Sequence, residues 1–162
     1  MSNVAIVYHS GFGHTQALAD AIARGIQSVP GATATLIPVD EAEARAGELD
    51  AADAIVFGSP TYMGGISAEF ARFKDWTSKR WLTRAWQNKL ASGFTVSASW
   101  GGDKHGTLHL LRHGFKDRNA KFELCQFRPA NRKNDALYFS REAIPSRKMG
   151  AKTVPMLKQV CN

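Results

Sequence analysis

The sequence predicts an α/β fold with a doubly wound, parallel sheet of five strands and helices on both faces. Short apolar runs of strand type alternate with segments whose apolar residues recur at helical spacing. Glycine and proline mark the boundaries between these segments. No repeat, linker or low-complexity tract interrupts the alternation over 162 residues. We therefore expect a single domain, residues 1–162.

Local patterns support each element of the first half of the chain. The first helix places Leu18, Ala21, Ile22 and Ile26 on one face, and Pro30-Gly31 ends it. The acidic connection after the second strand has room for a short helix. In order, we predict the strand Asn3–Tyr8, the helix His14–Val29, the strand Ala32–Val39, the connection Asp40–Asp50 and the strand Ala52–Gly58.

The second half continues the alternation. Its first helix carries aromatic residues that we expect to be buried, namely Phe70, Phe73 and Trp76. Its last helix contains Pro155, which should bend or break it. In order, we predict a helix from Ser67 to about Thr83, the strand Leu90–Ser97, the helix Lys104–Gly114, the strand Lys121–Phe127 and the helix Arg147–Val160.

Composition and charge limit the classes of function. The formal net charge is +7, and residues 112–162 hold 12 of the 21 Lys and Arg side chains. This basic third is a solvated face or attracts an anionic nicotinamide nucleotide. We do not expect nucleic acid as a partner, because no DNA- or RNA-binding motif accompanies the charge. We expect no membrane span and no signal peptide. Cys125 and Cys161 form no Cys-x-x-Cys, so we expect free thiols and a cytoplasmic location.

The junction between the first strand and the first helix predicts an anion site. Ser10, Gly11, Phe12, Gly13, His14 and Thr15 follow an apolar strand and open a helix. Backbone N–H groups in a first helical turn have no partner within the helix and attract an anion together with the helix dipole. The loop has no Lys or Arg and fails both the triphosphate-loop and the dinucleotide patterns. A cofactor monophosphate held by neutral donors fits it best; an ordinary helix cap is the alternative.

The segment Val7–Thr15 resembles the FMN phosphate loop of the flavodoxin superfamily. It is most similar to the flavodoxin-like NAD(P)H:quinone oxidoreductases, the tryptophan-repressor-binding-protein-like family. The resemblance runs from Asn3 to about Gly102 and is patchy beyond. It implies a flavodoxin-like fold, FMN as cofactor and NAD(P)H as co-substrate.

Two further loops lie at the same edge of the predicted sheet and complete the expected flavin site. Ligands of doubly wound sheets bind outside the carboxyl ends of the strands, at the switch point of strand order. After the third strand, Gly58–Ile66 resembles the family's ring-binding loop and offers an apolar wall and backbone donors. After the fourth strand, a second loop corresponds to the family's loop over the ring; a helix cap is its alternative. The ring-contacting residues are expected to be Pro60, Thr61, Tyr62, Met63, Gly64, Ser97, Ala98, Ser99, Trp100, Gly101 and Gly102.

Other residues carry weaker expectations. His105, His109 and His113 lie in line along one helical face and span too much length for one ion, so we expect no metal site. The resemblance implies substrate-side roles for Trp81 and His113, although Trp81 is equally compatible with a subunit contact. Arg128 and Arg132 are candidates for the phosphates of the nicotinamide nucleotide.

These observations predict an FMN-dependent enzyme that passes a hydride from NAD(P)H through FMN to a quinone or a similar small acceptor. No protein acid or base is required, because the cofactor carries the chemistry. The alternatives are a flavodoxin-type electron carrier and a degenerate FMN-binding protein without turnover. The aromatic residues Phe70, Phe73, Trp76, Trp81 and Trp86 exceed what one helix face hides, so we also expect a homo-oligomer, a dimer or a tetramer.

Overall fold

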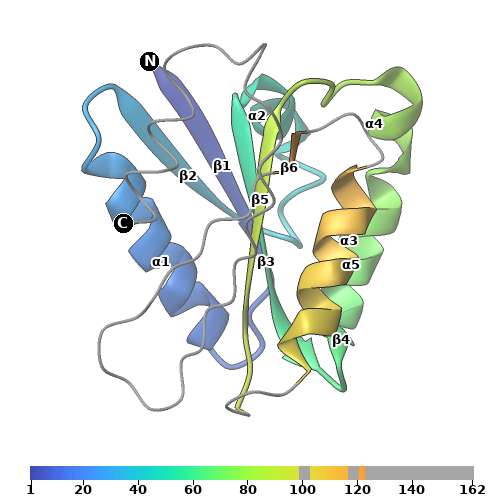
Figure 1. Ribbon diagram of the computed structural model, residues 1–162. Helices are drawn as coiled ribbons and strands as arrows, with labels where there is room; N and C mark the ends of the chain where they lie inside the picture. The colour runs from blue at the N-terminus through green and yellow to red at the C-terminus, as the bar shows by residue number, and fades with distance from the viewer. Residues whose placement is uncertain (99–102, 117–120, 123–162) are drawn as a thin grey trace.

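The computed structural model describes residues 1–98, 103–116 and 121–122. Five parallel strands form a sheet of order β2-β1-β3-β5-β6, and the short β4 pairs antiparallel with β3. Helix α1 covers one face, whereas α3 and α5 cover the other (Figure 1). The predicted α/β class, the parallel sheet and the helices on both faces are confirmed. The strand order reverses its direction between β1 and β3, and doubly wound sheets bind ligands at this switch point.

The element bounds match the predicted ones within a few residues at most boundaries. The strands are β1 (Ser2–Tyr8), β2 (Ala32–Pro38), β3 (Ala54–Tyr62), β4 (Gly65–Ile66), β5 (Leu90–Val96) and β6 (Lys121–Phe122). The helices are α1 (His14–Gln27), α2 (Ala46–Ala51), α3 (Ala68–Trp76), α4 (Ser78–Thr83) and α5 (Lys104–Lys116). The rest of the predicted last strand, the last helix and both cysteines lie outside the described residues.

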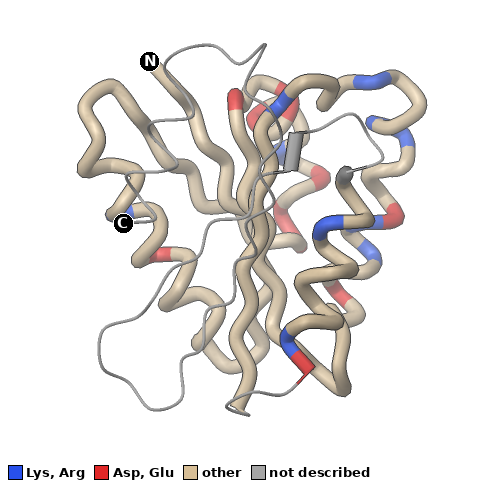
Figure 2. The backbone as a smooth tube through the Cα atoms, in the orientation of Figure 1, with Lys and Arg blue, Asp and Glu red and all other residues tan. Residues whose placement is uncertain are grey.

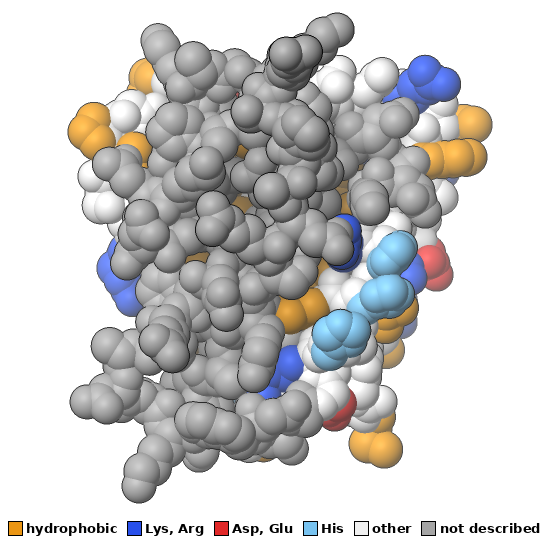
Figure 3. Space-filling view, in the orientation of Figure 1, with side chains coloured by type: hydrophobic (Ala, Val, Ile, Leu, Met, Phe, Trp, Pro, Cys, Tyr) orange, Lys and Arg blue, Asp and Glu red, His pale blue; other side chains and the backbone are white. Residues whose placement is uncertain are grey.

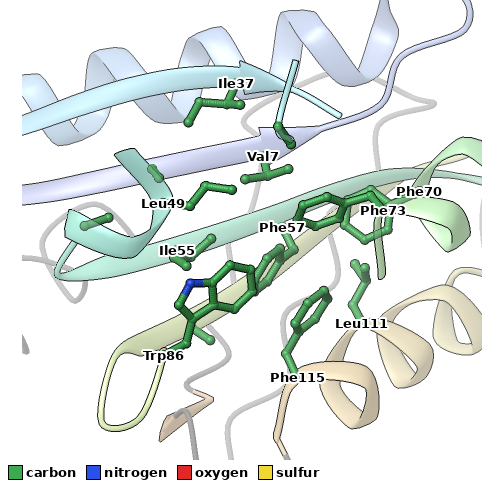
Figure 4. Packing of buried hydrophobic residues seen from close by; sticks show 14 of the residues in the cluster. Val7, Ile37, Leu49, Ile55, Phe57, Phe70, Phe73, Trp86, Leu111 and Phe115 are labelled. Atoms are coloured by element: carbon green, nitrogen blue, oxygen red, sulfur yellow. The ribbon is translucent and has the colours of Figure 1, made fainter. Parts of the chain in front are cut away.

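Alternate strand residues feed two separate cores, as the two-residue period of a strand requires. On the α1 side, Val4, Ile6 and Val56 pack against Ala19 and Ile26. On the other side, the Phe57 ring stacks on Phe115 at 3.7 Å between centroids. The neighbours of Phe57 in this second core come from α2, α3, α5 and the turn before β5: they include Leu49, Phe70, Phe73, Trp86 and Leu111 (Figure 4).

Two predicted boundaries are wrong. The predicted loop Gly58–Ile66 is largely sheet, because β3 continues in register with β5 as far as Pro60 opposite Val96 and then turns back through β4. The predicted helix from Ser67 to Thr83 is two helices that meet at Thr77. The Thr77 hydroxyl donates to the Lys74 carbonyl at 2.6 Å, a local bond that competes with helix continuation.

Three of the five aromatic residues from which we predicted a homo-oligomer do not form an exposed apolar surface. Phe70, Phe73 and Trp86 are buried in the chain's own core, because α3, α5 and the turn before β5 converge on Phe57. Trp76 packs against that core, and Trp81 is 54% exposed. The oligomeric state itself stays a prediction.

Candidate functional site

The first loop has the geometry of an anion cradle. Gly13 precedes α1 in the left-handed conformation, with φ 82°, and nothing lies within 4 Å of the position a Cβ would take. The Ser10 hydroxyl accepts a hydrogen bond from the Gln16 backbone N–H at 3.2 Å, which closes the loop and leaves its own proton to donate. His14 is exposed, whereas Thr15 is buried. The predicted positions therefore surround an open space in front of the helix N-terminus.

The turn between β3 and β4 lies against this loop. An ideal Cβ on Gly11 would lie 2.6 Å from the Tyr62 hydroxyl oxygen, and the Phe12 and Tyr62 rings meet edge-on at 6.4 Å between centroids. Phe12 is 81% exposed, and Met63, at the turn, is fully exposed. Exposed apolar side chains that lie next to one another often mark a ligand or partner site. The two loops together form an apolar wall beside an anion cradle.

The predicted third loop is described only in part. Ser97 is partly buried and Ala98 is exposed, while Ser99, Trp100, Gly101 and Gly102 lie outside the described residues. At the base of this edge, the buried Thr61 hydroxyl contacts the hydroxyls of Thr95 and Thr107 at 2.7 and 2.8 Å. These bonds connect the ends of β3 and β5 to the first turn of α5. Thr61 thus has a different position from Tyr62 and Met63: it is a buried support, only 8% exposed.

The residues expected to contact the substrate or the nicotinamide nucleotide do not lie at this site, as far as the structure describes them. Trp81 is on α4, at the opposite edge of the sheet (Figure 1). His113 lies on α5 nine residues beyond Lys104, about 13 Å of helix rise from the site edge. It belongs to an exposed row with His105 and His109, which Figure 3 shows in pale blue. Arg128 and Arg132 lie outside the described residues.

A cleft of about 650 Å³ lies beside the first loop, and no sequence motif predicted it. Its lining includes His9, Asp40 and Arg72. The His9 Nδ1 is buried 3.6 Å from a Glu69 carboxylate oxygen. Tyr8 also lines the cleft; burial, and then the nearby carboxylates of Asp20, Glu41 and Asp40, raise the pKa of its hydroxyl. A titratable residue directly after an apolar strand was the signal available for His9.

The residues present fit FMN. The cradle offers backbone N–H groups and a hydroxyl to a phosphate, and its open space at Gly13 leaves room for one. Phe12, Tyr62 and Met63 offer an apolar surface to a flat ring. Neither part requires a charged side chain in the first loop, and that loop contains no Lys or Arg.

The model of the NADPH-dependent FMN reductase family matches residues 37–120, just over half of the chain. The chain belongs to this family. FMN is the cofactor that membership and the flavodoxin-like structural neighbours imply, as the sequence predicts. The predicted relationship to flavodoxin-like NAD(P)H:quinone oxidoreductases is confirmed as well.

The similar curated proteins include a flavodoxin and several NAD(P)H dehydrogenases (quinone). The chain is 44% identical over 115 residues to Flavodoxin FldP of Pseudomonas aeruginosa, covering 68% of this chain and 59% of that protein. It is 34% identical over 141 residues to an NAD(P)H dehydrogenase (quinone) of Trichlorobacter lovleyi, covering 70% and 69%. The chain thus spans less than two thirds of the length of FldP.

Among solved structures, the crystal structure of the flavodoxin, WrbA-like protein from Agrobacterium tumefaciens is similar to the chain. The TM-score is 0.68 and the sequence identity 45%, over 75% of this chain and 76% of that one. An oxidised flavodoxin 1 from Bacillus cereus, 21% identical with a TM-score of 0.61, supports the flavodoxin-like fold alone.

Proposed function

We propose that this family member is an FMN-dependent oxidoreductase that accepts a hydride from NAD(P)H and passes two electrons to a quinone or a similar small acceptor. The observation that carries the proposal is the exposed apolar wall of Phe12, Tyr62 and Met63 directly beside the Gly13 cradle. Bound FMN would supply the hydride chemistry. An NAD(P)H dehydrogenase (quinone) relative covered over 69% of its length supports the same activity.

The chain's own residues bind and orient in this proposal. The first-turn N–H groups of α1 and the Ser10 hydroxyl hold the phosphate. Tyr62 and Met63 cover part of the ring, and the strand pairing of β3 with β5 keeps their turn in place. Because this wall lies at the protein surface, a flat acceptor could reach the outer face of a ring bound against it.

The proposal also covers the binding of the co-substrate, the number of domains, the cellular location and the oligomeric state. Arg128 and Arg132 bind or attract the phosphates of NAD(P)H; replacing both by Ala should raise the KM for NADPH more than for NADH and flatten the salt dependence of the rate. We also propose a single domain, a cytoplasmic enzyme and a homo-oligomer. Among the described helices, none is long and apolar enough to span a membrane.

A flavodoxin-type electron carrier is the second candidate, and the relationship to Flavodoxin FldP favours it. Electron carriers dock their partners through complementary surface fields of clear sign. Residues 1–111 hold nearly equal numbers of acidic and basic side chains, so this part of the chain has no net charge of clear sign. Figure 2 shows basic and acidic residues interspersed along the helices.

Absorbance spectroscopy of the purified protein separates the two candidates. The protein is saturated with FMN, freed of excess cofactor and mixed anaerobically with NADPH or NADH, and benzoquinone is then added. The enzyme is bleached by the nucleotide and regains its colour with the quinone. A protein that binds FMN and stays oxidised with both nucleotides is a carrier, and a protein that binds no FMN refutes both proposals.

A further inference from the structure

The cleft beside the first loop adjoins the phosphate cradle. Ser10 and Gln16 belong to both, because they line the cleft and also close the loop through their 3.2 Å hydrogen bond. His9 lines the cleft as well, and its Cε1 is 3.9 Å from the position of a Cβ on Gly11. The cleft is therefore the space next to a phosphate bound in the cradle.

Helix α5 packs closely against the turn between β3 and β4. A Cβ on Gly106 would overlap the carbonyl oxygen of Gly64 in that turn, so helix and turn touch through backbone. In the same helical turn, Thr107 contacts Thr61 at 2.8 Å. A ligand larger than FMN has no room at this contact, whereas the cleft offers open space.

The cleft lies at the carboxyl ends of β1 and β2 and is bounded by α3. The Val39 backbone N–H donates to the Tyr8 carbonyl at 3.0 Å, which keeps the ends of the two strands together. Asp40 follows directly and lines the cleft. In doubly wound folds that bind dinucleotides, an acidic residue after the second strand accepts a hydrogen bond from a ribose hydroxyl. Asp40 has the corresponding place in this chain.

Polar side chains of the cleft are available to a ligand. Asp40 and Arg72 are exposed, and neither side chain forms a hydrogen bond or an ion pair within the residues that the structure describes. The buried His9 Nδ1 is 3.6 Å from a Glu69 carboxylate oxygen and has no hydrogen-bond partner there either. A bound molecule can therefore engage these groups without breaking an existing contact.

The lining has the composition of a nucleoside site. Its carboxylates and its one guanidinium belong to Asp40, Glu43, Glu69 and Arg72. Carboxylates accept hydrogen bonds from neutral hydroxyls and repel phosphates, which favours ribose over a more highly phosphorylated ligand. A single guanidinium suits one phosphate. Apolar contacts for a base come from Pro38, Val39, Phe73 and Trp76. The volume of about 650 Å³ lies within the range of small-molecule sites.

We propose that this cleft binds the adenosine of FAD, so that the site accepts FAD as well as FMN. The inference rests on the proposed function, because it takes the flavin phosphate to lie in the cradle. FAD is FMN whose phosphate is linked to AMP, and the cleft adjoins that phosphate. Asp40 binds a ribose hydroxyl, Arg72 binds the second phosphate, and the apolar lining contacts the adenine. FMN occupies the cradle and leaves the cleft open.

Three ligands test the proposal on the purified wild type, freed of bound flavin. They are FMN, FAD and the methyl ester of FMN, which carries a phosphodiester charge and lacks adenosine. FAD should bind about tenfold more tightly than the methyl ester, because only FAD places hydrogen-bonding groups in the cleft. Isothermal titration calorimetry measures the three affinities. Equal affinities for FAD and the ester would overturn the proposal, and this measurement needs no variant.

Two variants locate the adenosine. Asp40→Asn and Arg72→Gln should each weaken FAD about tenfold and change the affinity for FMN less than about twofold. Asp75→Asn, on the same helix as Arg72, and Lys79→Gln on α4 are matched controls outside the cleft lining and should leave both affinities unchanged. All four side chains are exposed, so the variants should fold, as circular dichroism checks.

Other outcomes separate this inference from the proposed function. Equal losses of FMN and FAD affinity in the Asp40 and Arg72 variants would mean that these residues act on the cradle, and would overturn the proposal. A higher KM for NADH with unchanged FAD affinity would place the adenosine of NADH in the cleft and overturn it too. In both cases FMN binding by the wild type leaves the proposed function intact. A wild type that binds none of the three flavins refutes the proposed function itself.

Discussion

Polar groups have opposite roles at the two ends of the parallel strands. At the end of the sheet where the parallel strands begin, polar side chains form hydrogen bonds and ion pairs with other residues of the chain. The Trp86 indole donates to Asp50 at 2.7 Å, Arg80 lies 3.5 Å from the same carboxylate, and Lys89 donates to the Asp50 carbonyl at 2.8 Å. The Arg80 guanidinium also covers the Trp76 ring at 4.0 Å. A single carboxylate thus connects α2, α4 and the turn before β5.

At the edge where the strands end, groups instead face outward. The α1 N-terminus opens onto free space at Gly13, and Phe12 and Met63 are exposed next to it. Hydrogen bonds between buried hydroxyls hold this end of the sheet in place, while its surface stays open to solvent. The comparison teaches that one edge provides stability and the other provides binding. Substitutions at matched positions should therefore separate the two properties.

The largest expected effect is at Trp86. Its indole is 3% exposed in the Phe57 core, so Trp86→Ala should lower the free energy of unfolding by about 3–5 kcal/mol. Trp81→Ala, at a residue 54% exposed on the neighbouring helix, should change it by less than about 0.5 kcal/mol. Urea titration followed by circular dichroism measures both. A large effect at Trp81 would mean that this side chain is covered in solution, and would support the homo-oligomer.

A pair of glycines tests whether the cradle binds phosphate. Gly13 and Gly31 have φ of 82° and 80°, and nothing lies within 4 Å of a Cβ on either. Val at each position should cost about 1–3 kcal/mol of folding free energy, because a β-branched residue is strained there. Gly13→Val should in addition abolish FMN binding, since its side chain fills the space of the phosphate, whereas Gly31→Val should bind FMN normally.

Fluorescence quenching of FMN gives the affinities for this pair. Equal FMN affinity in the two variants would remove the phosphate assignment from the first loop.

Two exposed apolar residues test the ring wall more gently. Met63, at the turn after β3, and Leu82, 77% exposed on α4, are surface residues on opposite edges. Gln at either position should leave stability within about 0.5 kcal/mol of the wild type. Met63→Gln should weaken FMN about fivefold through lost apolar contact, or about 1 kcal/mol, and Leu82→Gln should not. Isothermal titration calorimetry with FMN measures the difference, and equal affinities would place the ring elsewhere.

Patterns of neighbouring residues predicted much of this molecule. Strand alternation and the stripe of α1 depend on residues a few positions apart, and the phosphate loop is contiguous, so all three could be recognised. The continuation of β3 through Pro60 could not, because it depends on pairing with Val96, far along the chain. Likewise, the Trp86 indole pairs with the distant Asp50, and Thr107 of α5 pairs with Thr61 of β3. Long-range contacts decided each of the misjudged residues.

The smallest expected effect concerns an exposed ion pair. The Arg45 guanidinium holds the pKa of the Glu48 carboxyl below its ordinary value through a hydrogen bond of 2.7 Å. The stabilisation is present above the unfolded-state pKa and is lost as pH falls through the lower, folded-state pKa. Glu48→Gln should therefore lower the melting temperature slightly at neutral pH, and the two proteins should converge in acid and at high salt. Calorimetric melting across this pH range checks it; a difference that persists in acid contradicts the assignment.

The backbone contact between Gly106 and Gly64 has a consequence for how freely the sequence can vary. Glycine inside a helix costs about 0.5–1 kcal/mol relative to alanine, yet any larger residue at position 106 would push α5 away from the turn. In a library of all single substitutions, position 106 should accept almost nothing, while its exposed neighbour His105 accepts nearly everything. Variation that adapts the flavin wall to another acceptor is thus confined to outward side chains such as Met63, because the backbone beneath them has no alternative packing.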